Sequence, residues 1–284
     1  MLSALLGLLG AIVYGASDFL GGLAARQISA VKVTAINAVA GLALLMLGSF
    51  FIPSQWSITV LVTGLLGGLA GSACLVLLYA CLAIGPMSIL APIIALISAA
   101  IPIAVGFFRG ERLSAAGNIG LLVGAVAIVL ICLVPGEGRV RPSVRAVLMA
   151  CGSGISVGLY LIIIDLSPSN SGGAPLLITF AVTGLVMGAL MLLQRLTRRG
   201  AAPARATRQT VTFAILCGLT DAIAASLFLI ALRVGDLSVV SVLNALAPAG
   251  TIVLAALFLK ERIAKVQWVG LAVALVAAAL LALA

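Results

Sequence analysis

Long apolar stretches run through the whole chain, separated by short clusters of charged residues, glycine and proline. A helix that crosses the hydrocarbon core of a bilayer needs roughly 20 mostly apolar residues, and each stretch is close to that length. The pattern therefore predicts ten helices, over residues 3–24, 31–52, 57–83, 87–108, 115–134, 144–165, 174–195, 210–232, 237–259 and 266–283. The fold class that follows is an all-α membrane protein with ten transmembrane helices.

The composition supports a membrane location. Hydrophobic residues make up 64% of the chain and charged residues only 8%, whereas about 25% of residues are charged in soluble domains. The net charge of +9 does not indicate a nucleic-acid partner, because the basic residues lie mainly between the predicted helices. In such places they orient membrane spans. We expect a multi-pass protein whose partner is the lipid bilayer of the cell inner membrane.

The chain contains an internal repeat. Residues 85–133 and 235–283 align without a gap when shifted by 150, and 15 of the 49 positions are identical. The aligned pairs include Gly85 with Gly235, Ser88 with Ser238, Glu111 with Glu261 and Arg112 with Arg262. Because charged residues are rare in this chain, the aligned Glu-Arg pairs indicate a duplication more strongly than matching leucines do.

The duplication predicts how the two halves lie in the membrane. A first repeat of five helices covers residues 1–134, a linker covers 135–143, and a second five-helix repeat covers 144–284. Five is an odd number, so the second repeat must enter the membrane from the opposite side. Two inverted repeats around one site at the midplane are the geometry of alternating access.

Two acidic residues lie within the predicted helices. Asp18 is in the first helix, and Asp221 is about 11 residues from either end of the eighth. An acid inside the hydrocarbon layer is costly, and normally faces a cavity or a partner. We expect Asp18 and Asp221 to hold a substrate ammonium group or to carry a proton, which would allow coupling to a proton gradient.

Other polar residues and three prolines are candidates for the wall of a substrate cavity. Prolines inside helices free a backbone carbonyl and kink the helix, and broken helices often line the substrate path of transporters. Each of these features could equally serve helix packing. The candidate lining residues are Asn37, Tyr79, Ser156, Tyr160, Ser241 and Asn244, and the candidate kinks are Pro92, Pro102 and Pro248.

Two acidic residues at predicted helix ends are expected to stabilise the fold or to face the solvent, and not to bind substrate. Glu111 can pair with Arg109 or Arg112, or it can cap a helix end. Asp165 ends the sixth helix and is expected to be solvated. Thr179 and Thr183, one turn apart, are the polar pair of an otherwise plain seventh helix.

Several classes of protein are disfavoured. The chain has no histidine, and its five cysteines fall within apolar stretches without metal-like spacing, so we expect no metal and no cofactor. An enzyme would need a nucleophile beside a base or a metal cluster. A nucleotide-driven pump would need a phosphate-binding glycine loop. We therefore expect that the protein is not an enzyme.

These features together resemble a known family. The duplicated five-helix unit, with Gly110-Glu111-Arg112 in the first half and Leu246-Ala247-Pro248 through Lys260-Glu261-Arg262 in the second, is similar to the EamA family of the drug/metabolite transporter superfamily, including its YddG-type amino-acid exporters. The resemblance implies that helices 1, 3, 4, 6, 8 and 9 surround a central cavity, with the fifth and tenth at the periphery.

The chain departs from the family pattern at two candidate positions. Ser98 occupies the place of the family's proline in the fourth helix, between Pro92 and Pro102. Tyr14 replaces a tryptophan common in the first helix, so Tyr14, Tyr79 and Tyr160 become the aromatic candidates of the cavity.

The function expected from the residues and the resemblance is secondary transport. The protein would export small metabolites, most readily amino acids, across the inner membrane by alternating access, and it would work as a monomer. The alternative is proton-coupled efflux of multiple drugs or lipophilic cations, in which a membrane acid is neutralised in turn by a proton and by the drug.

The orientation of the chain has two opposing indications. Of the 16 Lys and Arg residues, 13 lie in the segments after the odd-numbered helices. The positive-inside rule thus places both termini outside the cytoplasm, whereas the family resemblance favours cytoplasmic termini. We give more weight to the charge count, because it belongs to this chain.

Overall fold

The computed structural model describes residues 1–25, 27–50, 54–84, 87–132, 143–197, 207–258 and 264–283, and these residues form only helices and their connections. The first half contains α1 (Leu2–Ala25), α2 (Ala30–Ser49), α3 (Ile58–Ile84), α4 (Met87–Phe108) and α5 (Ala115–Cys132). The second half contains α6 (Val144–Asp165), the short 3-10 helix η1 (Ser169–Ser171), α7 (Ala174–Thr197), α8 (Arg208–Val234), α9 (Leu237–Ala245), α10 (Ala247–Phe258) and α11 (Lys265–Leu281).

Each predicted apolar stretch corresponds to helix in the structure, with ends that differ by at most three residues. By length and composition, seven of the described helical segments could cross a membrane, counting Leu237–Phe258 as one segment. Three further apolar helices are shorter, at Ile93–Phe108, Ala115–Ile131 and Lys265–Leu281. The chain is thus an all-helical membrane protein, as the sequence predicts.

Of the candidate kinks, Pro248 coincides with a break in its helix, whereas Pro102 does not. The ninth predicted helix is broken into α9 and α10 at Leu246, two residues before Pro248. Because Pro248 has no N–H to donate to Asn244, the helix cannot continue undisturbed, and the Leu246 N–H instead bonds the Leu243 carbonyl at 3.1 Å. In contrast, α4 runs without interruption through Pro102.

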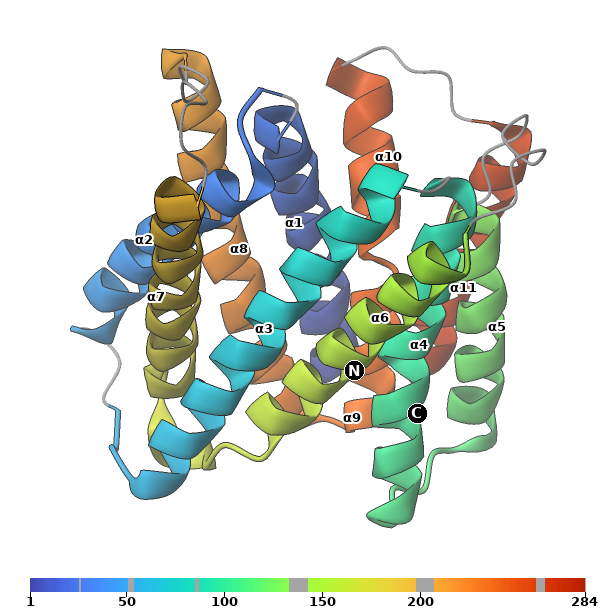
Figure 1. The fold of residues 1–284 in the computed structure, drawn as a ribbon. Coiled ribbons are helices and arrows are strands. Elements are labelled where there is room, and N and C mark those ends of the chain that lie inside the picture. Colours follow the sequence, from blue (N-terminus) through green and yellow to red (C-terminus); the bar gives the residue numbers. More distant parts are fainter. Residues whose placement is uncertain are drawn as a thin grey trace.

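The helices pack in a regular pattern (Figure 1). In the centre, α1 packs on α8 and α6 packs on α3. Helix α4 lies against α6, whereas α9 and α10 lie against α1. Helix α2 contacts α7 and α8, and α3 also contacts α7. Helices α5 and α11 pair with each other at one edge of the bundle, at the periphery.

Two buried apolar clusters stabilise the bundle, and α9 belongs to both. One cluster joins α4, α5, α9 and α11 and includes Ile128, Ile131 and Leu243. The other joins α1, α6, α7, α8 and the first turns of α9, where Leu237 and Val240 are buried. The start of α9 is therefore fixed between the two halves of the chain.

Glycines allow the closest helix contacts around the centre. A Cβ atom at Gly218 of α8 would lie 2.8 Å from the Cα atom of Asn37 in α2. A Cβ atom at Gly15 of α1 would lie 2.7 Å from the Cα atom of Gly250 in α10. Small residues let backbones approach in this way, and at Gly218 the contact holds the Asn37 backbone directly against α8.

Candidate functional site

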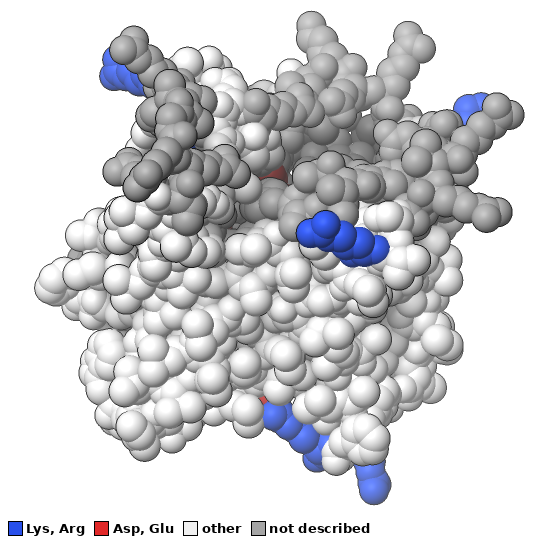
Figure 2. Space-filling view, viewed as in Figure 1, with Lys and Arg blue, Asp and Glu red and all other residues white. Residues whose placement is uncertain are grey.

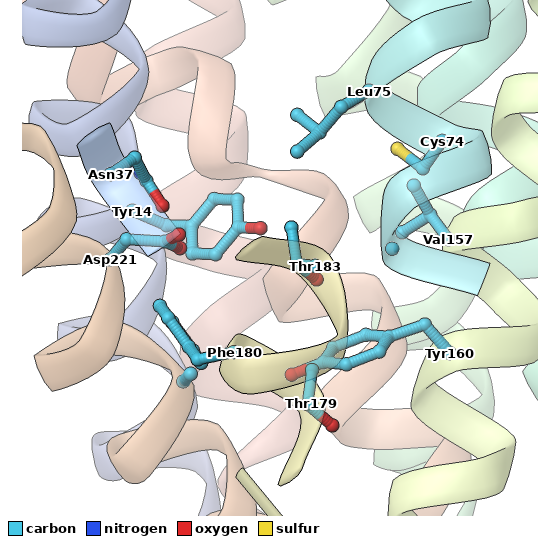
Figure 3. Close-up of a pocket in the computed structure, with 12 residues that line it drawn as sticks. Tyr14, Asn37, Cys74, Leu75, Val157, Tyr160, Thr179, Phe180, Thr183 and Asp221 are labelled. Atoms are coloured by element: carbon cyan, nitrogen blue, oxygen red, sulfur yellow. The ribbon is translucent and has the colours of Figure 1, made fainter. Parts of the chain in front are cut away.

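A cavity of about 80 Å³ lies between helices of both halves. Its polar side chains come from α1, α2, α3, α6, α7 and α8, and they point toward one another across the space (Figure 3). The lining residues are Tyr14, Asn37, Gly71, Cys74, Leu75, Val157, Tyr160, Thr179, Phe180, Thr183, Asp221 and Ala225. Among these described residues, Asp221 is the one with an ionisable carboxyl group.

Asp221 lies beside Tyr14 and Asn37 on one side of the cavity (Figure 3). The Tyr14 ring packs edge-on against Phe228, with 6.1 Å between the ring centroids. This packing fixes the tyrosine next to the carboxylate, so the cavity has an acidic side with one hydroxyl and one amide.

Cys217 joins the three helices that form the acidic side. The Ser17 hydroxyl of α1 donates to the Cys217 carbonyl at 2.9 Å. The Asn37 amide nitrogen of α2 donates to the Cys217 sulfur at 3.1 Å. In this arrangement Cys217 is buried and positions Asn37 one helical turn from Asp221.

Asp18 extends the acidic surface along α1. Tyr14, Asp18 and Gly22 are spaced by four residues and therefore share one face of the helix. Asp18 and Gly22 are exposed, and a Cβ atom at Gly22 would meet no atom of the described residues within 4 Å. The carboxyl groups of Asp18 and Asp221 are close enough for their charges to repel each other. Asp18 therefore lies on the same face of α1 as the lining residue Tyr14, one turn nearer the C-terminal end of the helix.

The opposite side of the cavity comes from α3, α6 and α7. Tyr160 of α6 directs its hydroxyl group toward Thr179 (Figure 3). The hydroxyls of Thr179 and Thr183 donate to the carbonyls of Gly64 and Gly68 in α3, at 3.3 and 3.5 Å. These two threonines therefore hold α7 against α3 while they line the space.

One end of the molecule is closed by polar contacts between the halves. The Glu111 carboxylate, in the turn after α4, accepts hydrogen bonds from the Leu237 N–H at 2.8 Å, the Ser238 N–H at 3.2 Å and the Ser238 hydroxyl at 2.5 Å. Glu111 therefore caps the N-terminus of α9, although the residue at the N-cap position is Asp236, which makes no such bond. Burial and the nearby Glu111 raise the pKa of Asp236.

Two further contacts lie at the same end. Arg109 forms an ion pair with Asp165 at 2.5 Å, so Asp165 is not the solvated residue that the sequence suggested. The Asn170 amide donates to the Gln55 side chain at 2.6 Å. Each of these contacts joins the first half to the second. The opposite end is hollowed, and acidic atoms are visible at the base of the hollow (Figure 2).

Comparison with known proteins identifies the second half of the chain. Residues 144–283 match the model of the EamA-like transporter family. The second half of the chain is therefore an EamA-like unit. This family is part of the drug/metabolite transporter superfamily of membrane proteins.

Solved structures show the same fold. One, described only as a crystal structure of a protein, is 19% identical to this chain with a TM-score of 0.78, and the alignment covers 98% of this chain and 95% of that one. At this identity, the likeness concerns the fold of the EamA-like chain alone. A search of curated proteins finds no match.

The structure brings together four of the predicted site residues of this EamA-like protein, and it places a fifth beside them. Tyr14, Asn37, Tyr160 and Asp221 line the cavity, and Asp18 lies one turn from Tyr14. The side chains of Tyr79 and Pro92 are outside the described part of the chain.

Four other predicted residues are not among the described lining residues. The hydroxyls of Ser98 and Ser156 donate to carbonyls of their own helices, at Ala95 and Gly152, both at 2.8 Å. Ser241 donates to the carbonyls of Leu237 and Ser238 in α9. Asn244 lies on the same short helix and is also absent from the lining. A helix carbonyl is an alternative partner for a serine hydroxyl within its own turn.

The helices that line the described cavity differ in part from the set that the EamA resemblance implied. That set included helices 4 and 9 and left out 2 and 7. Among the described residues, the cavity takes Asn37 from α2 and Thr179, Phe180 and Thr183 from α7, and none from α4 or α9. The signal that could have revealed α7 was the Thr179–Thr183 spacing, which places both hydroxyls on one face.

Proposed function

We propose that this protein is a secondary transporter of ten spans, built from two inverted five-helix repeats, and that it exports small metabolites across the inner membrane by alternating access. The observation that carries the proposal is a cavity between the two halves with one acid, Asp221, in its wall and a second, Asp18, one helical turn from the lining residue Tyr14. The residues of the repeats are 1–134 and 144–284, with 135–143 as the linker.

The packing pattern supports the inverted relation. When each helix is exchanged for its counterpart in the other half, the contact of α1 with α8 becomes that of α6 with α3. The contact of α4 with α6 becomes that of α9 and α10 with α1, and the contact of α2 with α8 becomes that of α7 with α3. The two helices in each of the pairs α2–α7 and α5–α11 are counterparts of each other, so the exchange leaves these two contacts unchanged. A two-fold relation between the halves has this consequence.

The charges of the cavity favour a substrate with an ammonium group. Asp221 lines the space and Asp18 lies beside it, whereas the described lining contains no lysine or arginine. Two nearby carboxylates in a partly desolvated site attract a cation or a proton. We assign Asp18 and Asp221 to the ammonium group or to proton exchange, with Asn37, Tyr14 and Tyr160 shaping the site for a neutral amino acid.

The second candidate function, efflux of lipophilic cations, is supported by the absence of a basic side chain from the described lining. An amino acid also carries a carboxylate, and the described lining offers it no basic side chain. A cation without a carboxylate needs none, and the rings of Tyr14, Phe180 and Tyr160 can attract it through cation–π contacts. Competition between amino acids and aromatic cations would separate the two functions.

The charge distribution supports export. The hollow lies at the end where α1 finishes and where α2, α6, α8 and α11 begin. In the sequence, the segments that follow the odd-numbered predicted helices carry 13 of the 16 basic residues, and the positive-inside rule places these segments in the cytoplasm. The cavity would then be open to the cytoplasm and ready to take up a substrate for export.

The test is transport by the purified protein in proteoliposomes, with labelled amino acids and organic cations, with and without a pH gradient. We expect saturable movement of at least one ammonium compound, and a loss of about tenfold or more for Asp221→Asn and Asp18→Asn because each removes a carboxylate that would attract the ammonium group. Thr220→Val is the matched control, since Thr220 neighbours Asp221 but bonds the Leu216 and Cys217 carbonyls of its own helix. Full activity of both acid variants would exclude the proposed roles.

A further inference from the structure

A second cavity, of about 590 Å³, lies between the last turns of α2 and the C-terminal half of α8. Apolar side chains form most of its wall, among them Leu44, Leu47, Ile223, Leu227 and Ile230. Leu47, Ile223 and Ile230 are exposed. In a membrane protein these exposed apolar residues face the bilayer, so the cavity is a groove open to lipid.

The groove is separate from the cavity lined by Tyr14, Asn37, Tyr160 and Asp221, called the transport cavity below. The two share no described lining residue. Asp221 and Ala225 point from α8 into the transport cavity, whereas Ile223, Leu227 and Ile230 of the same helix belong to the groove. Helix α8 therefore separates the two spaces.

One cation, Arg233, closes the groove at the end near the closed face. Its Nη2 atom donates to the Ser171 hydroxyl at 2.8 Å and to the Gly172 carbonyl at 2.7 Å. Its Nε atom is buried and has no hydrogen-bond partner among the described residues. The one ion pair found among those residues is that of Arg109 with Asp165, so no described acid neutralises Arg233.

A buried donor without an acceptor and a charge without a counter-ion are both costly. A guanidinium group offers five N–H donors in a planar fork that fits phosphate oxygens. Arg233 lies in the last turn of α8, where a membrane helix approaches the level of the lipid head groups. The groove thus presents an apolar channel for a hydrocarbon chain with an anion-binding group at its interfacial end.

We propose that this groove binds one phospholipid, with an acyl chain along α2 and α8 and the phosphodiester on Arg233. The phosphate accepts hydrogen bonds from the guanidinium donors that Ser171 and Gly172 leave free. The acyl chain covers the exposed leucine and isoleucine side chains. Because the lipid contacts both α2 and α8, it also stabilises the pair of helices that carry Asn37 and Asp221.

Native mass spectrometry of the full-length, delipidated protein tests this proposal with three probes: phosphatidylglycerol, a diacylglycerol with the same chains, and inorganic phosphate. We expect retention of one phosphatidylglycerol at least about tenfold stronger than of diacylglycerol, and no retention of phosphate alone, because charge and chain act together. Equal retention of the two lipids by the unchanged protein would overturn the proposal, and retention of phosphate alone would indicate an anion site instead.

Two variants separate the charge from the channel. Arg233→Gln should reduce phosphatidylglycerol retention about tenfold by removing the charged donors, whereas Arg112→Gln, a change of another arginine outside the groove, should leave it unaltered. Ser226→Phe keeps Arg233 with its Ser171 contact and fills the groove with a ring, so it should also abolish retention. Unchanged retention in both Arg233→Gln and Ser226→Phe would overturn the assignment of the site.

Discussion

The two ends of the transport cavity differ in how their polar groups are satisfied. At the closed end, Glu111, Arg109 and Gln55 of the first half each bond a group of the second half. At the open end, Asp18 is exposed, and no described residue lies within 4 Å of the Cβ position of Gly22 on the same face of α1. The closed end is therefore held by paired groups, whereas the open end presents an acid to the solution.

This difference has a consequence for movement between the halves. Each contact at the closed end has one partner in each half, so a rotation of one half against the other would break all of them together. Helix α9 is the element most affected, because its capping group, Glu111, comes from the first half while Asp236, at its own N-cap position, makes no side-chain bond. The stability of the first turn of α9 thus reports whether the end is closed.

The largest effect is expected for Glu111→Ala. The change removes three hydrogen bonds to a charged group, each of which contributes about 1.5–3 kcal/mol when fully formed, and leaves the Leu237 and Ser238 N–H groups without their acceptor. Amide hydrogen exchange in the first turn of α9 should become about ten to a hundred times faster.

The control for Glu111→Ala is within the same molecule. The start of α11 is capped by its own Gln267, whose side-chain oxygen accepts from the Ala264 N–H at 3.0 Å. Exchange there should not change. If α9 keeps its protection in Glu111→Ala, the glutamate does not hold the closed end.

A smaller effect of the same sign is expected for Gly106→Ala, which keeps the charge. A Cβ atom at Gly106 would overlap the Glu111 carboxyl group and lie 2.5 Å from the Ser238 hydroxyl. The carboxylate must shift, so we expect exchange in α9 to rise several-fold, within about tenfold. Gly188→Ala in α7 is the matched control, because no atom lies within 4 Å of its Cβ position. Equal protection in the two variants would mean that Glu111 adapts without losing its bonds.

The positions of the helices follow from the sequence because membrane spans obey a simple length rule. Apolar runs near 20 residues fix the helices, and Pro248 marks the break at Leu246. Pro102, unlike Pro248, does not interrupt its helix. Its missing N–H frees the Ser98 carbonyl, and a Cβ atom at Gly158 of α6 would approach that oxygen to 3.4 Å. Helix α6 thus lies close to the carbonyl that Pro102 leaves free, and α4 continues through the proline.

The site follows from the sequence only in part. Asp221 could be predicted because a carboxylate in a membrane helix is costly. Ser98, Ser156 and Ser241 could not be distinguished from lining residues, because a serine on a helix can bond either its own backbone or a ligand. The bond from Glu111 to α9 joins residues more than 120 positions apart, and Glu261, its counterpart in the repeat, lies outside the described residues.

Asp236→Asn is expected to strengthen the closed end by a few-fold. Burial and the Glu111 charge raise the pKa of Asp236, so the closed end favours the neutral form and is weakened by the charged form at neutral pH. Acidification should therefore slow exchange in α9, after correction for the intrinsic exchange rate, as the pH falls toward this raised pKa. The variant should show slower exchange at pH 7 and a smaller dependence on pH. Faster exchange in Asp236→Asn would show that the carboxylate caps α9 after all.

The smallest effect is expected for the ion pair between Arg109 and Asp165. The Arg109 side chain is 36% exposed and that of Asp165 is 17% exposed, and exposed pairs contribute only about 0.2–1 kcal/mol. A double-mutant cycle with Arg109→Gln and Asp165→Asn, measured by exchange in α9, should give a coupling in that range that decreases in 0.5 M salt, since such pairs are screened. A coupling as large as the Glu111→Ala effect would instead make the ion pair the main contact of the closed end and reduce the Glu111 cap to a local feature of α9.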